Sequence, residues 1–326
     1  MTAAALEVRG LTLTFPFADE RIAVVDHLDL SLAHGETLAL VGESGCGKSM
    51  TALALMRLVP RPGRIESGSV RLDGEEIFDL PVAAMRRVRG GRMALIFQEP
   101  MTSLNPVVCV GAQLVEAIRL HEPVSAAAAR ARARELLVRV GIPDAAARFA
   151  AYPHQLSGGL RQRVMIAMAV AARPSVLIAD EPTTALDVTI QAQILALLRE
   201  LQREEGTAIL LITHDLGVVA GGADRVAVMY AGRIVEQASC TDLLATPRHP
   251  YSRGLLAATP AAVRPGTRLA EIPGTVPAPA QWGRGCRFAP RCPLAVERCR
   301  RDVPPLVAVA DGWSVACPVT SERCHG

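Results

Sequence analysis

The chain has few aromatic residues and lacks any long apolar run. Of its 326 residues only 3% are Phe, Trp or Tyr, although 50% are hydrophobic. The longest apolar stretch lies around Val164 to Ala172, well short of the roughly 18 to 20 residues that a membrane-spanning helix needs. The first residues also lack a basic region followed by an apolar segment, so we expect no signal peptide. These absences favour a cytosolic globular protein that reaches a membrane only through partners.

The chain also lacks a strong charge of either sign. It has 35 basic and 32 acidic residues, a formal net charge of +3. This balance does not indicate a surface for nucleic acid. The length allows one large domain or two of ordinary size, with ample material for a core.

Residues 42–49 read Gly-Glu-Ser-Gly-Cys-Gly-Lys-Ser, which is the pattern of a phosphate-binding loop. The apolar run 37–41 before it is typical of a buried strand, and residues 50–56 after it favour a helix. Glycines let successive N–H groups point at phosphate oxygens, while Lys48 can reach the β- and γ-phosphates and Ser49 can bind Mg²⁺. A glycine-rich turn with a chance lysine is the alternative, and the strand-loop-helix context disfavours it.

The rest of the chain predicts an α/β fold. Alternating residues in 5–35 predict two or three short strands on the N-terminal side. Residues 107–150 predict a mostly helical insertion, with Val110, Leu114 and Ile118 at four-residue spacing. Buried strands then alternate with helices, so we expect a mostly parallel sheet covered by helices, with an N-terminal antiparallel part.

Two carboxylates follow the apolar run 176–179. Asp180 at a strand end suits a Mg²⁺ partner, and the adjacent Glu181 could accept a proton from an attacking water. A solvated turn is the alternative for an Asp-Glu pair. Phe15, ahead of the loop, could stack on an adenine ring or belong to the core.

Five segments in one order resemble the ATPase subunits of ABC transporters. They are the loop at 42–49, Gln98, Leu156–Gly159, Leu177–Asp187 and Ile212–Asp215. The resemblance covers roughly residues 6–240. It implies a P-loop ATPase domain over 1–240 with a helical signature insertion at about 99–172, followed by a loop-rich, proline-rich extension over 241–326.

The resemblance also implies the role of each site residue. Glu181 would be the catalytic base, His214 the switch histidine at the γ-phosphate, Lys48 a catalytic cation, and Gln98 the sensor of Mg²⁺ and the membrane partner. Mg²⁺ would be held by Ser49, Gln98 and Asp180. The ATP-binding set would be Phe15, Gly42, Ser44, Gly45, Cys46, Gly47, Lys48, Ser49, Met50, Gln98, Ser157, Gly158, Gly159, Asp180 and Asp187.

One position departs from the family pattern. The signature usually ends in Gln, whereas this chain has Leu160 after Leu156-Ser157-Gly158-Gly159. We expect function to persist, because the Ser and the Gly-Gly backbone that contact phosphate are retained.

Four further segments are similar to the oligopeptide/dipeptide importer branch: residues 98–106, 249–256, 272–277 and 285–293. The resemblance implies an ATPase that energises peptide import at the cytoplasmic face of the cell membrane. It would work with two transmembrane permease subunits, a second ATPase subunit and an extracytoplasmic solute-binding protein, and without nucleic acid. Nickel, glutathione or another small solute remains an alternative cargo. A soluble ABC ATPase acting on nucleic acid or the ribosome is the other alternative.

Five of the eight cysteines lie within residues 286–326. Cys286, Cys292, Cys299 and Cys317 lack the paired C-x2-C spacing of ordinary zinc ribbons and iron-sulfur runs, so spacing alone favours free thiols. The peptide-importer resemblance makes a 4Fe-4S cluster on these four residues an equal alternative. Cys240 and Cys324 would then take no part.

Overall fold

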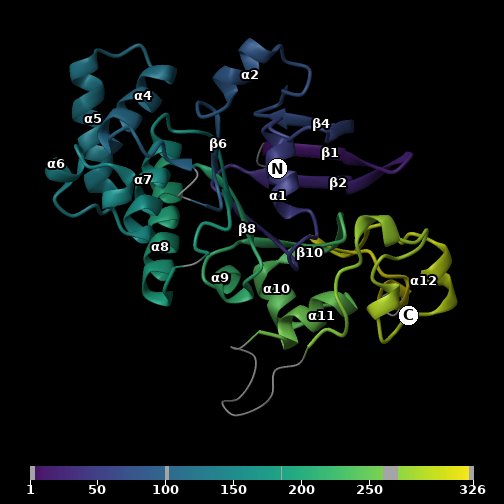
Figure 1. The fold of residues 1–326 in the computed structure, drawn as a ribbon. Coiled ribbons are helices and arrows are strands. Elements are labelled where there is room, and N and C mark those ends of the chain that lie inside the picture. Colours follow the sequence, from purple (N-terminus) through teal and green to yellow (C-terminus); the bar gives the residue numbers. More distant parts are fainter. Residues whose placement is uncertain (1–3, 100–102, 185, 260–270, 323–326) are drawn as a thin grey trace. The chain divides into compact units, whose positions relative to one another are not determined.

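The computed structural model describes residues 4–99, 103–184, 186–259 and 271–322 (Figure 1). The chain folds as two units. The first comprises residues 1–5, 33–36 and 79–210, and the second comprises residues 6–32, 37–78 and 211–326. Each unit is described by itself.

The predicted N-terminal antiparallel sheet is confirmed, but its strands are longer than expected. Its strands run in the order β2 (Glu20–Ala33), β1 (Ala4–Phe17), β4 (Arg64–Leu72) and β5 (Glu75–Glu76). Gly10 and His27 interrupt the alternation of apolar residues, and both have positive φ, +58° and +49°. The pairing of β1 with β4 shifts register between Arg9 and Thr12. The strands continue through these local distortions, where the sequence pattern predicted a break.

The second unit carries a further run of strands in the order β11 (Val307–Ala310), β12 (Trp313–Val315), β10 (Arg233–Ser239), β9 (Arg225–Tyr230) and β3 (Thr37–Val41). The β3–β9 pair is parallel and the other pairs are antiparallel. The prolines after residue 250 predicted an extension made largely of loops, and the structure adds two short strands: β11 and β12 extend this sheet, with β12 paired to β10 at Glu236–Val315 and Gln237–Ser314. Burial of Trp313 and Val315 provides the physical reason.

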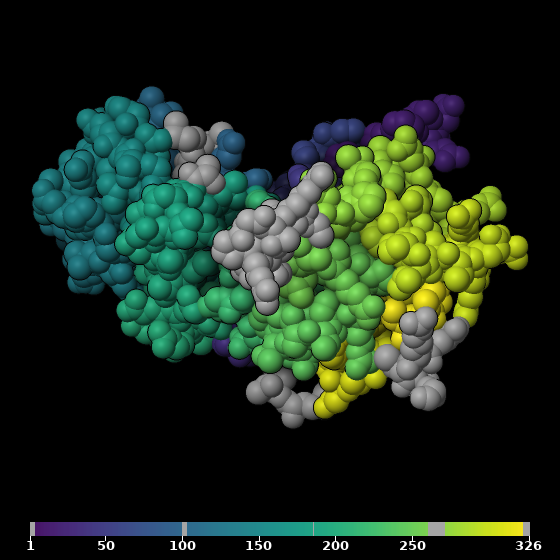
Figure 2. All heavy atoms as spheres, turned by 90° about the horizontal axis from the view of Figure 1, so that it is seen from below, coloured from purple at the N-terminus to yellow at the C-terminus, as the bar shows by residue number. Residues whose placement is uncertain are grey.

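Short helices complete the second unit, and Figure 2 shows the yellow C-terminal residues lying against green residues of the same unit. They are α1 (Lys48–Leu55), α9 (Leu216–Ala220), α10 (Cys240–Ala245), α11 (Pro250–Ala257), η3 (Pro279–Gln281), η4 (Ala289–Arg291), α12 (Glu297–Arg301) and α13 (Pro318–Glu322).

The first unit contains the predicted helical insertion. Val110, Leu114 and Ile118 of α4 (Val110–His121) are fully buried, which confirms the helical spacing predicted from the sequence. Its strands β6 (Met93–Ile96) and β7 (Val176–Asp180) pair in parallel, and β8 (Ala208–Thr213) passes from this unit into the other. Its helices are α2 (Val82–Val88), α4 (Val110–His121), α5 (Ala126–Arg139), α6 (Ala145–Arg148), η1 (Pro153–Gln155), α7 (Gly158–Val170) and α8 (Val188–Glu205).

Across the described ranges, the structure contains no helix with both the length and the apolar character needed to cross a bilayer.

Candidate functional site

The phosphate loop lies in the second unit, between the fully buried strand β3 and the first residue of α1. Two of its glycines are required by close backbone approaches. A Cβ on Gly42 would lie 2.2 Å from the carbonyl oxygen of Met229. Gly47 has a φ of +109°, and a Cβ there would lie 2.7 Å from the carbonyl oxygen of Val24. The loop therefore has the backbone that the motif demands, and larger residues are excluded at these two positions.

Lys48 folds back onto its own loop. Its side chain is buried, and Nζ donates to the carbonyl oxygens of Gly42 at 2.7 Å and Glu43 at 3.1 Å. Cys46, also buried, has its Sγ 3.8 Å from the same Nζ. Burial raises the pKa of the Cys46 thiol, although Lys48 opposes this shift. The ammonium group is thus held at the centre of the loop, where phosphate oxygens would meet it.

The other predicted loop residues are more accessible. Ser44 and Gly45 are exposed, and Ser49 and Met50 are half-buried at the start of α1. Phe15 is half-buried on β1, and its ring covers Gly63, where a Cβ would lie 2.6 Å from Cζ. The open face of the loop is therefore formed by residues 44 and 45.

The two strand-end carboxylates lie in the first unit at the end of β7. Asp180 is buried, whereas Glu181 is half-buried and has a positive φ of +46°. The Glu181 Oε2 atom accepts hydrogen bonds from Gln98 Nε2 at 3.1 Å and from Thr184 Oγ1 at 2.8 Å. The structure therefore brings together Gln98 and Glu181, two residues that are 83 positions apart. Thr184, which sequence reasoning gave no role, fixes the same oxygen.

The predicted signature begins helix α7 of the first unit. Ser157 is its N-cap and accepts from the Leu160 N–H at 3.4 Å. Ser157 and Gly158 are exposed, and a Cβ on Gly159 would lie 3.0 Å from Ile190 of α8. Leu160, the departure from the family pattern, is half-buried. Asp187 is exposed and caps α8 by accepting from the Ile190 N–H at 2.9 Å.

His214 belongs to the second unit. It is exposed directly after β8, ahead of α9, whose N-cap Asp215 accepts from the Gly217 N–H at 2.7 Å. The predicted site residues are thus shared between the units: the loop, Phe15 and His214 in the second, and the remainder in the first. Residues 100–102 and Ala185, which lie within matched segments, fall outside the described residues.

The four cysteines proposed for a cluster gather in one part of the second unit. The Cys286 N–H donates to the Cys299 carbonyl at 2.7 Å, and Cys286 and Cys292 pack against the hydrophobic core that contains Cys317. Burial raises the pKa of Cys286 to about 11. Within the described ranges, however, no three His, Cys, Asp or Glu side chains converge closely enough to hold a metal ion. Cys240 is a buried free thiol of α10, and Cys324 lies outside the described residues.

Sequence reasoning missed the partners of Glu43, the first variable residue of the loop. Both of its carboxylate oxygens bind Arg291, at 2.7 Å and 3.0 Å, and its backbone N–H donates to the Tyr251 hydroxyl at 2.8 Å. Tyr251 and Arg291 both occur in segments matched to the peptide-importer branch, which was the available signal. Their sequence distance from the loop concealed the contact.

Comparisons with known proteins agree with the motifs. The family model "ABC transporter" matches residues 25–184, and "Oligopeptide/dipeptide transporter, C-terminal region" matches residues 235–299. The chain is 48% identical to the dipeptide transport ATP-binding protein DppD of Escherichia coli, over 96% of each chain. It is 51% identical to the oligopeptide transport ATP-binding protein OppD of Salmonella typhimurium, over 96% of this chain and 92% of that protein.

Solved structures of ATP-binding cassettes share the fold, which confirms the predicted P-loop α/β class. A dimeric cassette in a post-hydrolysis state bound to ADP and Pi aligns with a TM-score of 0.65 and 28% identity, over 72% of this chain and 98% of that chain. An ABC transporter cassette from Clostridium perfringens, part of a CbiONQ complex, aligns with a TM-score of 0.63 and 27% identity, over 74% and 91%.

Proposed function

The chain belongs to the ABC transporter ATP-binding proteins of the oligopeptide/dipeptide type, and we propose that it hydrolyses ATP to energise the import of short peptides. The observation that carries this proposal is that two peptide-transport ATPases match it over nearly their whole lengths, including the C-terminal region.

ATP binding would depend on the second unit. Lys48, already held over the loop by the Gly42 and Glu43 carbonyls, would contact the β- and γ-phosphates, and the N–H groups of residues 44–49 would surround them. The hydroxyl of Ser49, with Gln98 and Asp180, would supply the oxygen ligands that Mg²⁺ prefers. The bound ion would neutralise phosphate charge. Phe15 would contact the base.

Hydrolysis would depend on Glu181 in the first unit. Its Oε2 is oriented by Gln98 and Thr184, which leaves the carboxylate able to accept a proton from water. His214 would contact the γ-phosphate. The work of the protein is placement and charge stabilisation, because the transferred phosphoryl group needs no covalent intermediate on the chain.

Assembly follows from the signature. Ser157, Gly158 and Gly159, with Asp187, would complete the ATP site of a second ATPase subunit, identical or related, in a head-to-tail pair. We place this pair at the cytoplasmic face of the cell membrane, bound to two permease subunits that receive peptide from an extracytoplasmic solute-binding protein. Nucleic acid has no part in this scheme. Residues 1–240 would form the ATPase domain, with the helical part at about 99–172, and residues 241–326 the extension.

We further propose a 4Fe-4S cluster on Cys286, Cys292, Cys299 and Cys317. The support is that the four thiols lie in one part of the second unit: the Cys286 N–H donates to the Cys299 carbonyl, and Cys286 and Cys292 pack against the core that contains Cys317. Iron and acid-labile sulfide, measured after anaerobic purification, should be present in the native chain and in Cys240→Ser, and should be lost in Cys299→Ser. A colourless, iron-free native protein would refute the cluster.

Transport by a strain lacking this chain tests the function. Uptake of labelled di- and tripeptides should be lost and should be restored by the native chain but not by Glu181→Gln. Nickel and glutathione uptake, measured in parallel, separate the alternative cargoes. If peptide uptake is unchanged and nickel or glutathione uptake is lost, the transported solute is nickel or glutathione rather than peptide. Unchanged uptake of all three would favour a non-transport ABC ATPase.

A further inference from the structure

Three segments of the extension converge on one residue of the phosphate loop. Tyr251 lies in the first segment, residues 249–256. The carbonyls of residues 272–274 lie in the second segment, residues 272–277, and Arg291 lies in the third, residues 285–293. The first and the third bind Glu43 directly, and the second holds Arg291. All of these contacts lie within the second unit. ATP chemistry as proposed above gives none of the three segments a role.

Arg291 reaches Glu43 from the extension as a two-pronged ion pair. Its Nη1 and Nη2 donate to Oε2 and Oε1 of Glu43 at 2.7 Å and 3.0 Å. The arginine side chain is only 5% exposed and that of Glu43 29% exposed. Because the arginine is buried and the geometry is bidentate, solvent screens this pair less than an exposed one.

The rest of the Arg291 guanidinium is anchored to the extension itself. Nε donates to the Pro273 carbonyl at 2.8 Å, and Nη2 also donates to the carbonyls of Ile272 at 3.3 Å and Gly274 at 3.1 Å. These bonds hold the arginine in place independently of Glu43. Removal of the glutamate side chain therefore breaks the bridge and leaves the anchor of the arginine intact.

Tyr251 supports the backbone of the same residue. Its hydroxyl accepts the Glu43 N–H at 2.8 Å, and its ring is fully buried, 4.6 Å from that of Tyr230 between centroids. The Glu43 carbonyl in turn accepts from Lys48 Nζ. The side chain, N–H and carbonyl of Glu43 are all engaged, the first two by the extension and the third by the phosphate-binding lysine.

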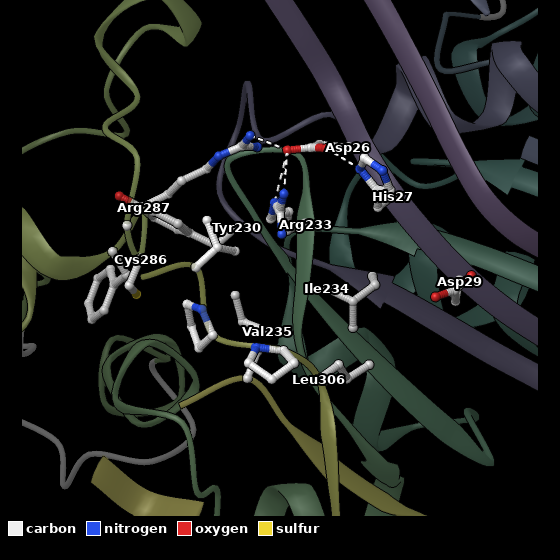
Figure 3. A pocket seen from close by; sticks show the side chains of 16 residues that line it. Asp26, His27, Asp29, Tyr230, Arg233, Ile234, Val235, Cys286, Arg287 and Leu306 are labelled. Atoms are coloured by element: carbon white, nitrogen blue, oxygen red, sulfur yellow. Dashed lines mark hydrogen bonds and ion pairs between the residues drawn. The ribbon is translucent and has the colours of Figure 1, made fainter. Parts of the chain in front are cut away.

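A second connection joins the extension to the middle of the loop. Arg287 forms an ion pair with Asp26 and donates to the carbonyl of Ala231. Figure 3 shows Arg287 and Arg233 both directed at Asp26. Gly232, which follows Ala231 in the chain, donates its N–H to the Cys46 carbonyl at 2.8 Å. The extension thus contacts the loop directly at Glu43 and indirectly at Cys46, through the backbone of residues 231 and 232.

We propose that Arg291 is a positioning residue for ATP binding: with Tyr251, it fixes Glu43 so that the phosphate loop is held in its binding conformation before nucleotide arrives. This rests on the proposed ATP binding and goes beyond it, because it gives the C-terminal extension a part in that binding. Pre-ordering of the loop improves affinity, since less conformational entropy is lost on binding.

The test is ATP affinity of the purified full-length chain, measured by equilibrium binding of a fluorescent ATP analogue with Mg²⁺. Glu43→Ala should weaken binding about tenfold, the effect expected for one charge-assisted contact. Arg291→Lys, which keeps the charge but loses the fork, should weaken it by less. The double variant should bind no more weakly than Glu43→Ala. Glu297→Ala, which breaks an exposed Arg–Glu pair in α12 of the same extension, is the matched control and should bind like the native chain.

Steady-state hydrolysis supplies a second readout. Glu43→Ala should raise KM for ATP while kcat stays within about twofold, a split that general unfolding would not produce. Native affinity in Glu43→Ala, or additive losses in the double variant, would overturn the role of Arg291. Lys48→Ala separates the two proposals. If it loses binding while Glu43→Ala does not, the positioning role fails and the proposed function stands. If Lys48→Ala also binds normally, the assignment of the loop itself is wrong.

Discussion

The two units hold their predicted nucleotide residues in different ways. In the second unit the phosphate loop is held by burial and by contacts with the extension. Lys48 and Cys46 are buried, and Glu43 is bound by Arg291 and Tyr251. In the first unit Gln98, Ser157 and Asp187 are exposed, and Glu181 is oriented by two side-chain hydrogen bonds. The residues proposed to bind ATP are therefore buried or held by several contacts, whereas most of those proposed for hydrolysis and assembly are exposed.

The largest effect should come from Glu181→Gln, which tests whether ATP hydrolysis can be lost while ATP binding is retained. The amide keeps the shape of the side chain but cannot accept a proton, so ATP turnover should fall by roughly 10²- to 10⁴-fold. ATP affinity should remain native, because the loop lies in the other unit. Turnover and equilibrium binding measured on the same preparation check this. Native turnover would reject Glu181 as the base.

Lys48→Ala should have the next largest effect and should act on binding. It removes an ammonium group that two loop carbonyls hold in place, and we expect ATP affinity to fall by roughly 10- to 100-fold. Equilibrium binding of the fluorescent analogue measures the loss. Undiminished affinity would mean that the loop at residues 42–49 does not bind ATP, and the comparison between the two units would then be wrong.

The stability of the second unit, which contains the phosphate loop, should also depend on pH through His249. Burial, assisted by Arg253, lowers the pKa of His249 to about 3, and its Nδ1 accepts the Tyr251 N–H at 3.0 Å. The folded-state pKa lies below the ordinary value, so the contribution of His249 is complete above about pH 6.5 and is lost as pH falls towards 3. Between pH 6.5 and 5 the free energy of unfolding should fall by about 2 kcal/mol.

His249→Asn sharpens this test. The asparagine oxygen can still cap α11, but the side chain no longer titrates, so the decline in stability between pH 6.5 and 5 should be smaller than in the native chain. Denaturant unfolding at several pH values measures it. Equal slopes in both proteins would assign the pH dependence to other groups.

The smallest effect should come from Arg301→Ala. Its pair with Glu297 has side chains 72% and 66% exposed, in contrast to the Arg291–Glu43 pair in the same extension. The free energy of unfolding should change by no more than about 0.5 kcal/mol, because solvent screens such pairs. The same unfolding measurement on Arg291→Lys is the comparison, and an equal loss of free energy in the two variants would show that burial does not distinguish the two pairs.

Local patterns predicted much of the fold. The spacing of Val110, Leu114 and Ile118 placed a buried helical face correctly, and the loop motif placed its strand and helix. Strand length was less predictable, because Gly10 and His27 interrupt the alternation without ending β1 and β2. The short strands of the extension were missed, since proline content dominates that region and β12 gains its stability from pairing with a distant strand.

By itself the sequence determined the chemistry: the phosphate loop, the strand-end carboxylates, the signature and the family that their order resembles. Those features are local, because each is a short run whose residue types carry its function. The tertiary structure alone decided that Arg291 and Glu43 are partners. They are 248 positions apart, and no spacing rule relates two such residues. Only the folding of the extension against β9 and β10 brings an arginine to the start of the loop, where it pairs with the half-buried carboxylate of Glu43.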